Sequence, residues 1–164
     1  MKKIVTIAML FTVLMVTMSA HTERTHEAAE GYNAPAMTIT TNDTTVSLTD
    51  MKGRYVMLTF WDSTDPKSRI AANTYTSLAR REASNKRLKV LSVNFDRSER
   101  LYREIVRHDG LEDALNVNIA PGQARETLAA AWNLKSGMKS YLIDPQGKIV
   151  AVNPTKDQVK KIIG

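Results

Sequence analysis

The sequence predicts an α/β fold in which a central mixed β-sheet is flanked by helices on both faces. Two almost continuous apolar segments, 55–61 and 88–95, are typical of strands buried on both faces of a sheet. A segment with the apolar spacing of a helix follows each of them, and two short strands joined by a turn occupy residues 140–152. Strands that alternate with helices and end in a hairpin and a last helix indicate a layered α/β domain.

The composition restricts the class of protein and of site. With 164 residues, of which 43% are hydrophobic and 24% charged, the chain has room for one globular domain. It contains no cysteine, which excludes disulfides, thiolate nucleophiles, cysteine zinc sites and lipidated N-terminal cysteines. We expect no catalytic residue, no metal and no cofactor.

The positive charge of the chain is modest. The formal charge of +6 falls to +4 when Lys2 and Lys3 are left out. Several of the basic residues recur at helical spacing, as in Arg97, Arg100, Arg103 and Arg107. This spacing predicts a solvated helix face and argues against a nucleic-acid partner.

The N-terminal residues 1–20 are predicted to be a signal peptide. Lys2 and Lys3 precede an apolar run over 4–16, and the small residues before Ala20 are followed by a polar stretch. The run is shorter than the about 20 apolar residues of a membrane span. We therefore expect cleavage near Ala20 and export, most simply to the periplasm. An uncleaved anchor, which would hold the chain at a membrane, is the alternative.

Between the predicted signal peptide and the strand 55–61, the sequence predicts a tether and a hairpin. The polar residues 21–33 predict a flexible tether, and the folded domain is expected to span residues 34–164. Residues 37–41 and 44–48 are predicted to form a hairpin around the turn pair Asn42-Asp43.

A helix is expected to begin directly after the strand 55–61. Asp65 has the side chain of an N-cap, and Pro66 suits the first helical position. The pattern predicts a helix that extends to Glu82 or Ala83. Its inward-facing residues are expected to be Ile70, Tyr75 and Leu78.

The C-terminal half continues the alternation. After strand 88–95, Asp96 or Ser98 is expected to cap a helix that ends at Gly110. Its inward-facing residues are expected to be Leu101, Ile105 and Val106. Residues 111–122 are interpreted as an irregular connection or insertion.

The last elements follow in short order. Residues 123–132 predict an alanine-rich helix. Strands 140–143 and 148–152 are joined by the turn 144–147, and a short helix is expected to end at Gly164.

Put in order, several of these segments resemble the thioredoxin-like superfamily, and within it the extracytoplasmic TlpA/ResA-type branch related to the AhpC/TSA peroxiredoxins. The similarity is carried by the turn region 46–53, the strand 55–61 and the hairpin 141–149. It runs from Ala34 to about Lys161 and implies a thioredoxin-like fold.

The same resemblance shows what this chain lacks. In the family, the strand that ends in a Phe-Trp pair is followed by a Cys-x-x-Cys motif. After Phe60-Trp61, Asp65 stands at the place of the first cysteine and Ser68 at the place of the second. Met138 stands where the superfamily has a cis-proline, and we expect its peptide bond to be trans, because a non-proline cis bond costs about 2.5–4 kcal/mol.

Two further family positions differ. Ala71 and Asn73 occupy places where this branch often carries a glutamate used in proton transfer and a proline that kinks the helix. An aspartate at the first cysteine position retains a negative charge and a cap at the helix N-terminus, but it has no nucleophilic sulfur. We give greater weight to a purely stabilising cap than to a functional one.

The resemblance implies a surface for binding rather than a reaction. We expect an exported, redox-inactive module of the cell envelope that binds a peptide or a partner protein through the former active-site surface. That surface is expected to comprise Trp61, Asp65, Pro66, Ser68 and Met138. Two alternatives stay open: a thiol-disulfide oxidoreductase or peroxiredoxin relative by ancestry, and a structural subunit that uses the sheet edge or residues 111–122.

Overall fold

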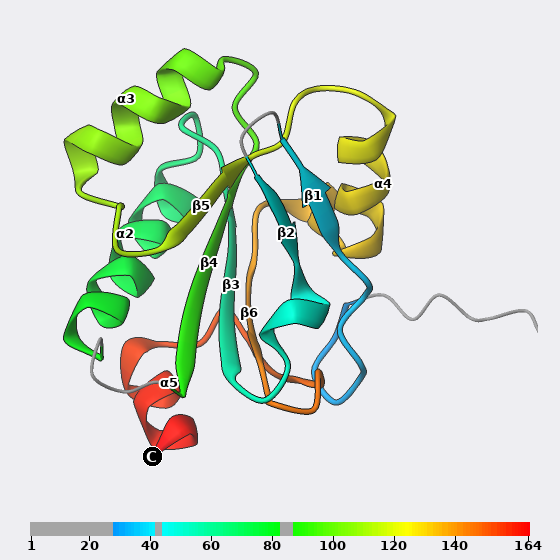
Figure 1. The fold of residues 1–164 in the computed structure, drawn as a ribbon, viewed down its shortest axis with the longest axis vertical. Helices are drawn as coiled ribbons and strands as arrows, with labels where there is room; N and C mark the ends of the chain where they lie inside the picture. Colours follow the sequence, from blue (N-terminus) through cyan, green and yellow to red (C-terminus); the bar gives the residue numbers. More distant parts are fainter. Residues whose placement is uncertain (1–27, 42–43, 83–86) are drawn as a thin grey trace, which may run out of the picture.

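The strands at the centre of the molecule form one five-stranded mixed sheet (Figure 1). The computed structural model describes residues 28–41, 44–82 and 87–164; the predicted signal peptide, most of the predicted tether and the turn pair Asn42-Asp43 lie outside them. The strand order is β5-β4-β3-β6-β7, with β3, β4 and β5 parallel and with β6 and β7 antiparallel to their neighbours. The strands are β3 (Tyr55–Trp61), β4 (Leu88–Asn94), β5 (Leu115–Asn118), β6 (Ser140–Ile143) and β7 (Ile149–Val152).

Helices cover both faces of this sheet, as the sequence predicts. One face is covered by α2 (Pro66–Arg81), α3 (Glu99–Asp109) and α5 (Lys156–Ile163). The other is covered by α4 (Gln123–Ala131) and by the separate hairpin of β1 (Thr38–Thr40) and β2 (Thr45–Ser47). Two 3₁₀ turns, η1 (Leu48–Met51) and η2 (Leu134–Ser136), complete the fold. No helix in the described part of the chain is long and apolar enough to cross a membrane.

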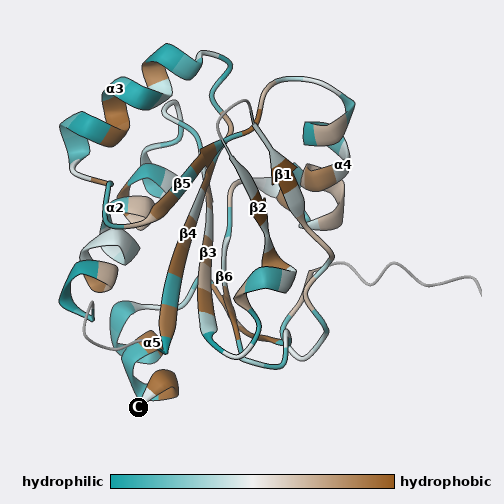
Figure 2. Ribbon diagram, viewed as in Figure 1, coloured by the Kyte–Doolittle hydropathy of each residue, from teal (hydrophilic) through white to brown (hydrophobic). Residues whose placement is uncertain are grey.

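Each face of the sheet has its own core, because successive side chains of a strand point to opposite faces. Val56, Leu58 and Phe60 pack with α4 and the hairpin, whereas Met57 packs with α2 and α5. The colours of Figure 2 show this apolar interior along β3, β4 and β6. Phe60 is also edge-to-face with Tyr141, whose ring centroid lies 6.2 Å away, so aromatic contacts reinforce the first core.

Four expectations about burial and boundaries are wrong in detail. Ile70 is 66% exposed, because the buried face of α2 follows Ser68, Ala72 and Thr76 and Ile70 lies on the opposite side. Leu101 is 41% exposed, because the packed stripe of α3 consists of Tyr102, Ile105 and Val106 and Leu101 lies at its margin.

The third correction concerns the start of the domain. Ala28 is buried in the core, and the N–H of Gly31 donates to the carbonyl of Ile149 at 2.9 Å. Residues 28–33, which the sequence assigned to the tether, therefore pack on the domain beside β7.

Residues 111–122 are not irregular throughout. They contain β5, which pairs in parallel with β4 from Leu91↔Leu115 to Asn94↔Asn118. The cap of α3 is Ser98, whose side chain accepts from the N–H of Leu101 at 3.2 Å, and not Asp96.

The burial pattern of α2 generates a stability prediction. Leu78 is fully buried against Met57 and Tyr75, so Leu78→Ala is expected to lower the free energy of unfolding by about 2–5 kcal/mol. On the same helix, Ile70→Ala should change it by less than about 0.5 kcal/mol. Urea unfolding followed by circular dichroism measures both; equal losses would contradict the placement of α2.

Candidate functional site

The candidate site begins at the end of β3. Trp61 is completely buried among Ala72, Ile105 and Leu111, and its Nε1 donates to Ser92 Oγ at 2.8 Å. Trp61 therefore anchors the loop that follows it and offers no surface to a partner.

Asp65 and Pro66 begin α2 as the sequence predicts. Asp65 has extended backbone angles, and its Oδ1 accepts from the N–H groups of Lys67 at 3.1 Å and Ser68 at 3.4 Å. Pro66 occupies the first turn, where its missing N–H leaves no broken bond, and it is exposed. The carboxylate thus stands at the positive end of the helix dipole.

Ser68 is buried, and its hydroxyl is used inside the loop. Its Oγ donates to the carbonyl of Asp65 at 2.9 Å and accepts from the N–H of Asp62 at 3.2 Å. The described histidine, His108, bonds to its neighbour Asp109 instead. These contacts explain Ser68 as a residue that closes the loop, and they give it no base to act as a nucleophile.

The loop between Trp61 and Asp65 is tied down at each position. Asp62 Oδ1 accepts from both the N–H and the hydroxyl of Thr64, at 2.8 and 2.5 Å. The N–H and hydroxyl of Ser63 both donate to Asp96 Oδ1, at 2.9 and 2.7 Å. In residues 28–41, 44–82 and 87–164, no cluster of three or more His, Cys, Asp or Glu side chains is placed to hold a metal ion.

Asp96, which the sequence named only as a candidate helix cap, has a role in this region that sequence reasoning did not predict. It is buried at the end of β4, and its second carboxylate oxygen accepts from Asn94 Nδ2 at 2.8 Å. Asn118 Nδ2, at the end of β5, donates to Asn94 Oδ1 at 2.6 Å. Polar residues at the carboxyl ends of three parallel strands are the signal that could have revealed this network.

Met138 lies beside the loop on the other side of β3. The N–H of Phe60 donates to the carbonyl of Lys139 at 3.0 Å, which brings the segment of Met138 to the end of β3. Met138 is half-buried against the core, and its peptide bond is trans as expected.

Of the five residues predicted for this surface, the structure leaves three accessible. Asp65, Pro66 and Met138 are exposed or half-buried, whereas Trp61 and Ser68 are buried. Three cavities of about 290, 530 and 790 Å³ in the described part of the chain are lined by other residues. The arrangement is a closed surface that presents a carboxylate at a helix N-terminus.

The first turns of α2 are also fixed to the end of α3. Arg69 makes two hydrogen bonds to Asp109, at 2.6 and 2.7 Å, and Asn73 Nδ2 adds a third at 3.3 Å. The hydrogen bonds from Arg69 hold the pKa of the Asp109 carboxyl well below its usual range, and His108 and Asn73 act in the same direction.

The sheet order, the helices on both faces and a capped helix directly after the central strand define a thioredoxin-like domain. The chain belongs to the AhpC/TSA family, whose model matches residues 30–152. No curated protein shows significant similarity to it. The chain therefore has the fold of this family but contains no cysteine.

Solved structures share the fold over most of the chain. The thioredoxin domain of a thiol-disulfide oxidoreductase from Bacteroides vulgatus is 26% identical, with a TM-score of 0.72 over 84% of this chain and 100% of that one. A thiol:disulfide interchange protein from Bacteroides sp. is 25% identical, with a TM-score of 0.67 over 82% and 88%. A thioredoxin-like protein from Parabacteroides distasonis is 28% identical, with a TM-score of 0.58 over 68% and 80%.

The capping geometry predicts a graded effect at Asp65. Asp65→Ala removes the acceptor for two helix N–H groups and should lower the free energy of unfolding by about 0.5–2 kcal/mol. Asp65→Asn keeps an oxygen acceptor and should cost less. Chemical denaturation measures both, and an alanine variant as stable as the parent would mean that the cap contributes nothing.

The ion pair between Arg69 of α2 and Asp109 of α3 predicts a pH dependence. Since the folded pKa of Asp109 lies below the unfolded value of about 3.9, its stabilisation is complete above that pH and is lost as the pH falls. Asp109→Asn should therefore cost about 1–3 kcal/mol at pH 7 and progressively less below about pH 4. Urea unfolding from pH 7 to 3 tests this, and a difference that does not shrink in acid would contradict it.

Proposed function

We propose that this chain is an exported, non-catalytic AhpC/TSA-family module of the cell envelope that binds a peptide or protein partner through its former active-site surface. The supporting observation is the set of hydrogen bonds that closes the loop 62–65. By the family motif, Asp65 and Ser68 take the places of the two cysteines, and both are engaged in hydrogen bonds that close the loop. The surface keeps a fixed shape without a group that can exchange disulfides or attack a peroxide.

A partner-binding role is supported by what stays accessible. Pro66 and Lys67 are exposed at the first turn of α2, and Asp65 and Met138 are half-buried. A rigid loop next to exposed side chains loses little conformational entropy on binding, which favours recognition. The relatives of known structure named above include a thiol-disulfide oxidoreductase and a thiol:disulfide interchange protein, whose fold this chain shares; the proposal assigns a binding role to that fold.

Export to the periplasm is part of the same proposal. It is supported by the basic start, the short apolar run and the small residues before Ala20. Fractionation of cells that express the full chain, combined with N-terminal sequencing of the envelope form, tests this. A chain recovered uncleaved in the cytoplasm would overturn it.

The absence of a thiol predicts the outcome of two activity assays. Purified protein should neither reduce insulin disulfides with dithiothreitol nor consume peroxide above a no-protein control, because no cysteine can form the required intermediates. The Bacteroides vulgatus thioredoxin domain serves as the positive control. Heat-labile turnover by this chain would contradict the proposal.

The binding role is tested by photo-crosslinking in the native envelope. A p-benzoylphenylalanine replaces Lys67, beside the cap, and in a control chain it replaces Arg81, which is exposed at the other end of α2. We expect a discrete adduct from position 67 alone. Identical adduct patterns from both positions, or no adduct at position 67, would overturn the proposal.

A further inference from the structure

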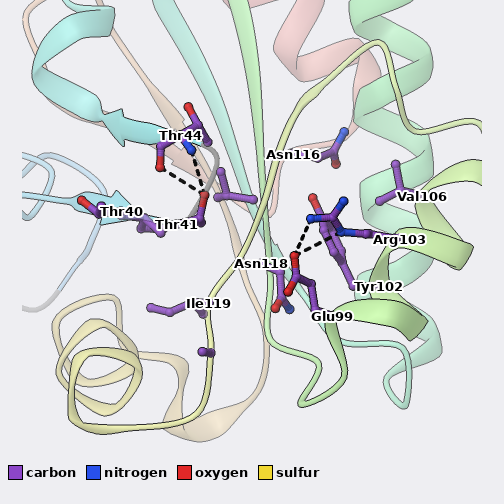
Figure 3. A pocket seen from close by; sticks show the side chains of 13 residues that line it. Thr40, Thr41, Thr44, Glu99, Tyr102, Arg103, Val106, Asn116, Asn118 and Ile119 are labelled. Atoms are coloured by element: carbon purple, nitrogen blue, oxygen red, sulfur yellow. Dashed lines mark hydrogen bonds and ion pairs between the residues drawn. The ribbon is translucent and has the colours of Figure 1, made fainter.

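The outer edge of β5 forms the floor of a groove. A cavity of about 530 Å³ lies along this edge, between the β1–β2 hairpin on one side and α3 on the other (Figure 3). The hairpin wall includes Ile39, Thr40 and Thr44, and the helix wall includes Tyr102 and Val106. The volume is within the range of pockets that hold ligands, about 300–1,000 Å³.

The floor presents backbone groups that the sheet does not use. β5 is the last strand of the sheet, and the N–H of Ile119 donates to the carbonyl of Asn94 at 3.0 Å. Because alternate residues of a strand bond to the same neighbour, Val117 and Ile119 face β4. The N–H and C=O groups of Asn116 and Asn118 therefore face the groove, and no described residue pairs with them.

Side chains hold this edge in place. Val117 is buried in the core, and Asn118 Nδ2 donates to the carbonyl of Asp96 at 3.0 Å. Asn116 Nδ2 donates to the carbonyls of Leu111 and Ala114, at 2.6 and 2.8 Å. Asn116 Oδ1 is buried and accepts no hydrogen bond within the described residues, so the floor of the groove contains an unsatisfied acceptor.

The described residues of the lining carry no net charge. The acid and the base among them, Glu99 and Arg103, pair with each other at 2.6 Å. The phenol of Tyr102 is neutral near pH 7, as it is for an ordinary tyrosine, and burial raises its pKa further, to about 12. The remaining lining side chains are threonine, asparagine and aliphatic groups. An uncharged ligand is complementary to this lining, whereas a polyanion would find no unpaired cation in it.

We propose that the groove binds an extended, uncharged peptide segment as an added strand along β5. Asn116 and Asn118 supply two donors and two acceptors, and the four residues of β5 give a pairing length of roughly 13 Å at about 3.3 Å per residue. The sheet edge of a second copy would bring its own hairpin and α3 against these walls, so a peptide is the occupant.

This site shares no residue with the former active-site surface. The two proposals can therefore be contradicted separately. Absence of the adduct at position 67 would contradict the partner surface at α2, whereas absence of peptide binding would contradict the groove at β5.

The test is a selection on the purified full chain from a displayed library of peptides of about ten residues without charged side chains. Thr40→Arg places a long cation in the groove from β1. Thr38→Arg is its matched control, because both threonines are exposed on the same face of β1 and each makes one hydroxyl contact of 3.3 Å to β2, but Thr38 does not line the groove.

Selected peptides should lose about tenfold or more in affinity to the Thr40→Arg protein and keep their affinity for the Thr38→Arg protein. Bound peptide should slow deuterium exchange of the backbone N–H groups of Asn116 and Asn118 by about tenfold or more. Synthetic peptides in which the backbone amides that face β5 are N-methylated should not bind, because they cannot donate to its carbonyls. No enriched peptide, equal binding by both variants, or exchange protection that arises from self-association without peptide would overturn the proposal.

Discussion

The buried carboxylate of Asp96 joins the parts of this molecule that carry its candidate sites. It accepts three hydrogen bonds: two from Ser63 in the β3–α2 loop and one from Asn94 at the end of β4. Asn118 at the end of β5 donates to Asn94 and to the carbonyl of Asp96. A buried charge is tolerated only when donors surround it, so these contacts are mutually dependent. The loop before the cap and the outer strand are thereby fixed by one network.

This dependence explains how the fold persists without the family's thiols. Polar groups of the loop bond to one another: Asp62 to Thr64, Ser63 to Asp96, and Ser68 to Asp65. A loop built for thiol chemistry must leave a sulfur accessible, whereas this loop places its serine inside and its aspartate on the helix N–H groups. The carboxylate of Asp65 places a negative charge at the positive end of the helix dipole and carries no nucleophilic sulfur.

The sequence predicts the features that local chemistry decides. The buried strands are recognised from unbroken apolar runs, and the start of α2 from the pair Asp65-Pro66. It does not predict β5, because Asn116 and Asn118 disfavour strands and only pairing with β4 overrides that preference. Ile70 is misplaced for a related reason: the buried face of α2 consists largely of small and polar side chains, so hydrophobicity alone points to the wrong side.

The two edge strands of the sheet, β7 and β5, differ in whether another segment bonds to their outer backbone groups. Along β7, the N-terminal segment supplies backbone partners: Gly31 N–H donates to the carbonyl of Ile149, and Ile149 N–H donates to the carbonyl of Tyr32 at 2.8 Å. At Ile149, the first residue of β7, that edge is covered by the chain itself, which is one way in which proteins prevent unwanted strand pairing. The β5 edge has walls but no covering strand in the described part of the chain. An incoming strand there displaces no backbone hydrogen bond between described residues, so its pairing bonds add to the stability of the complex.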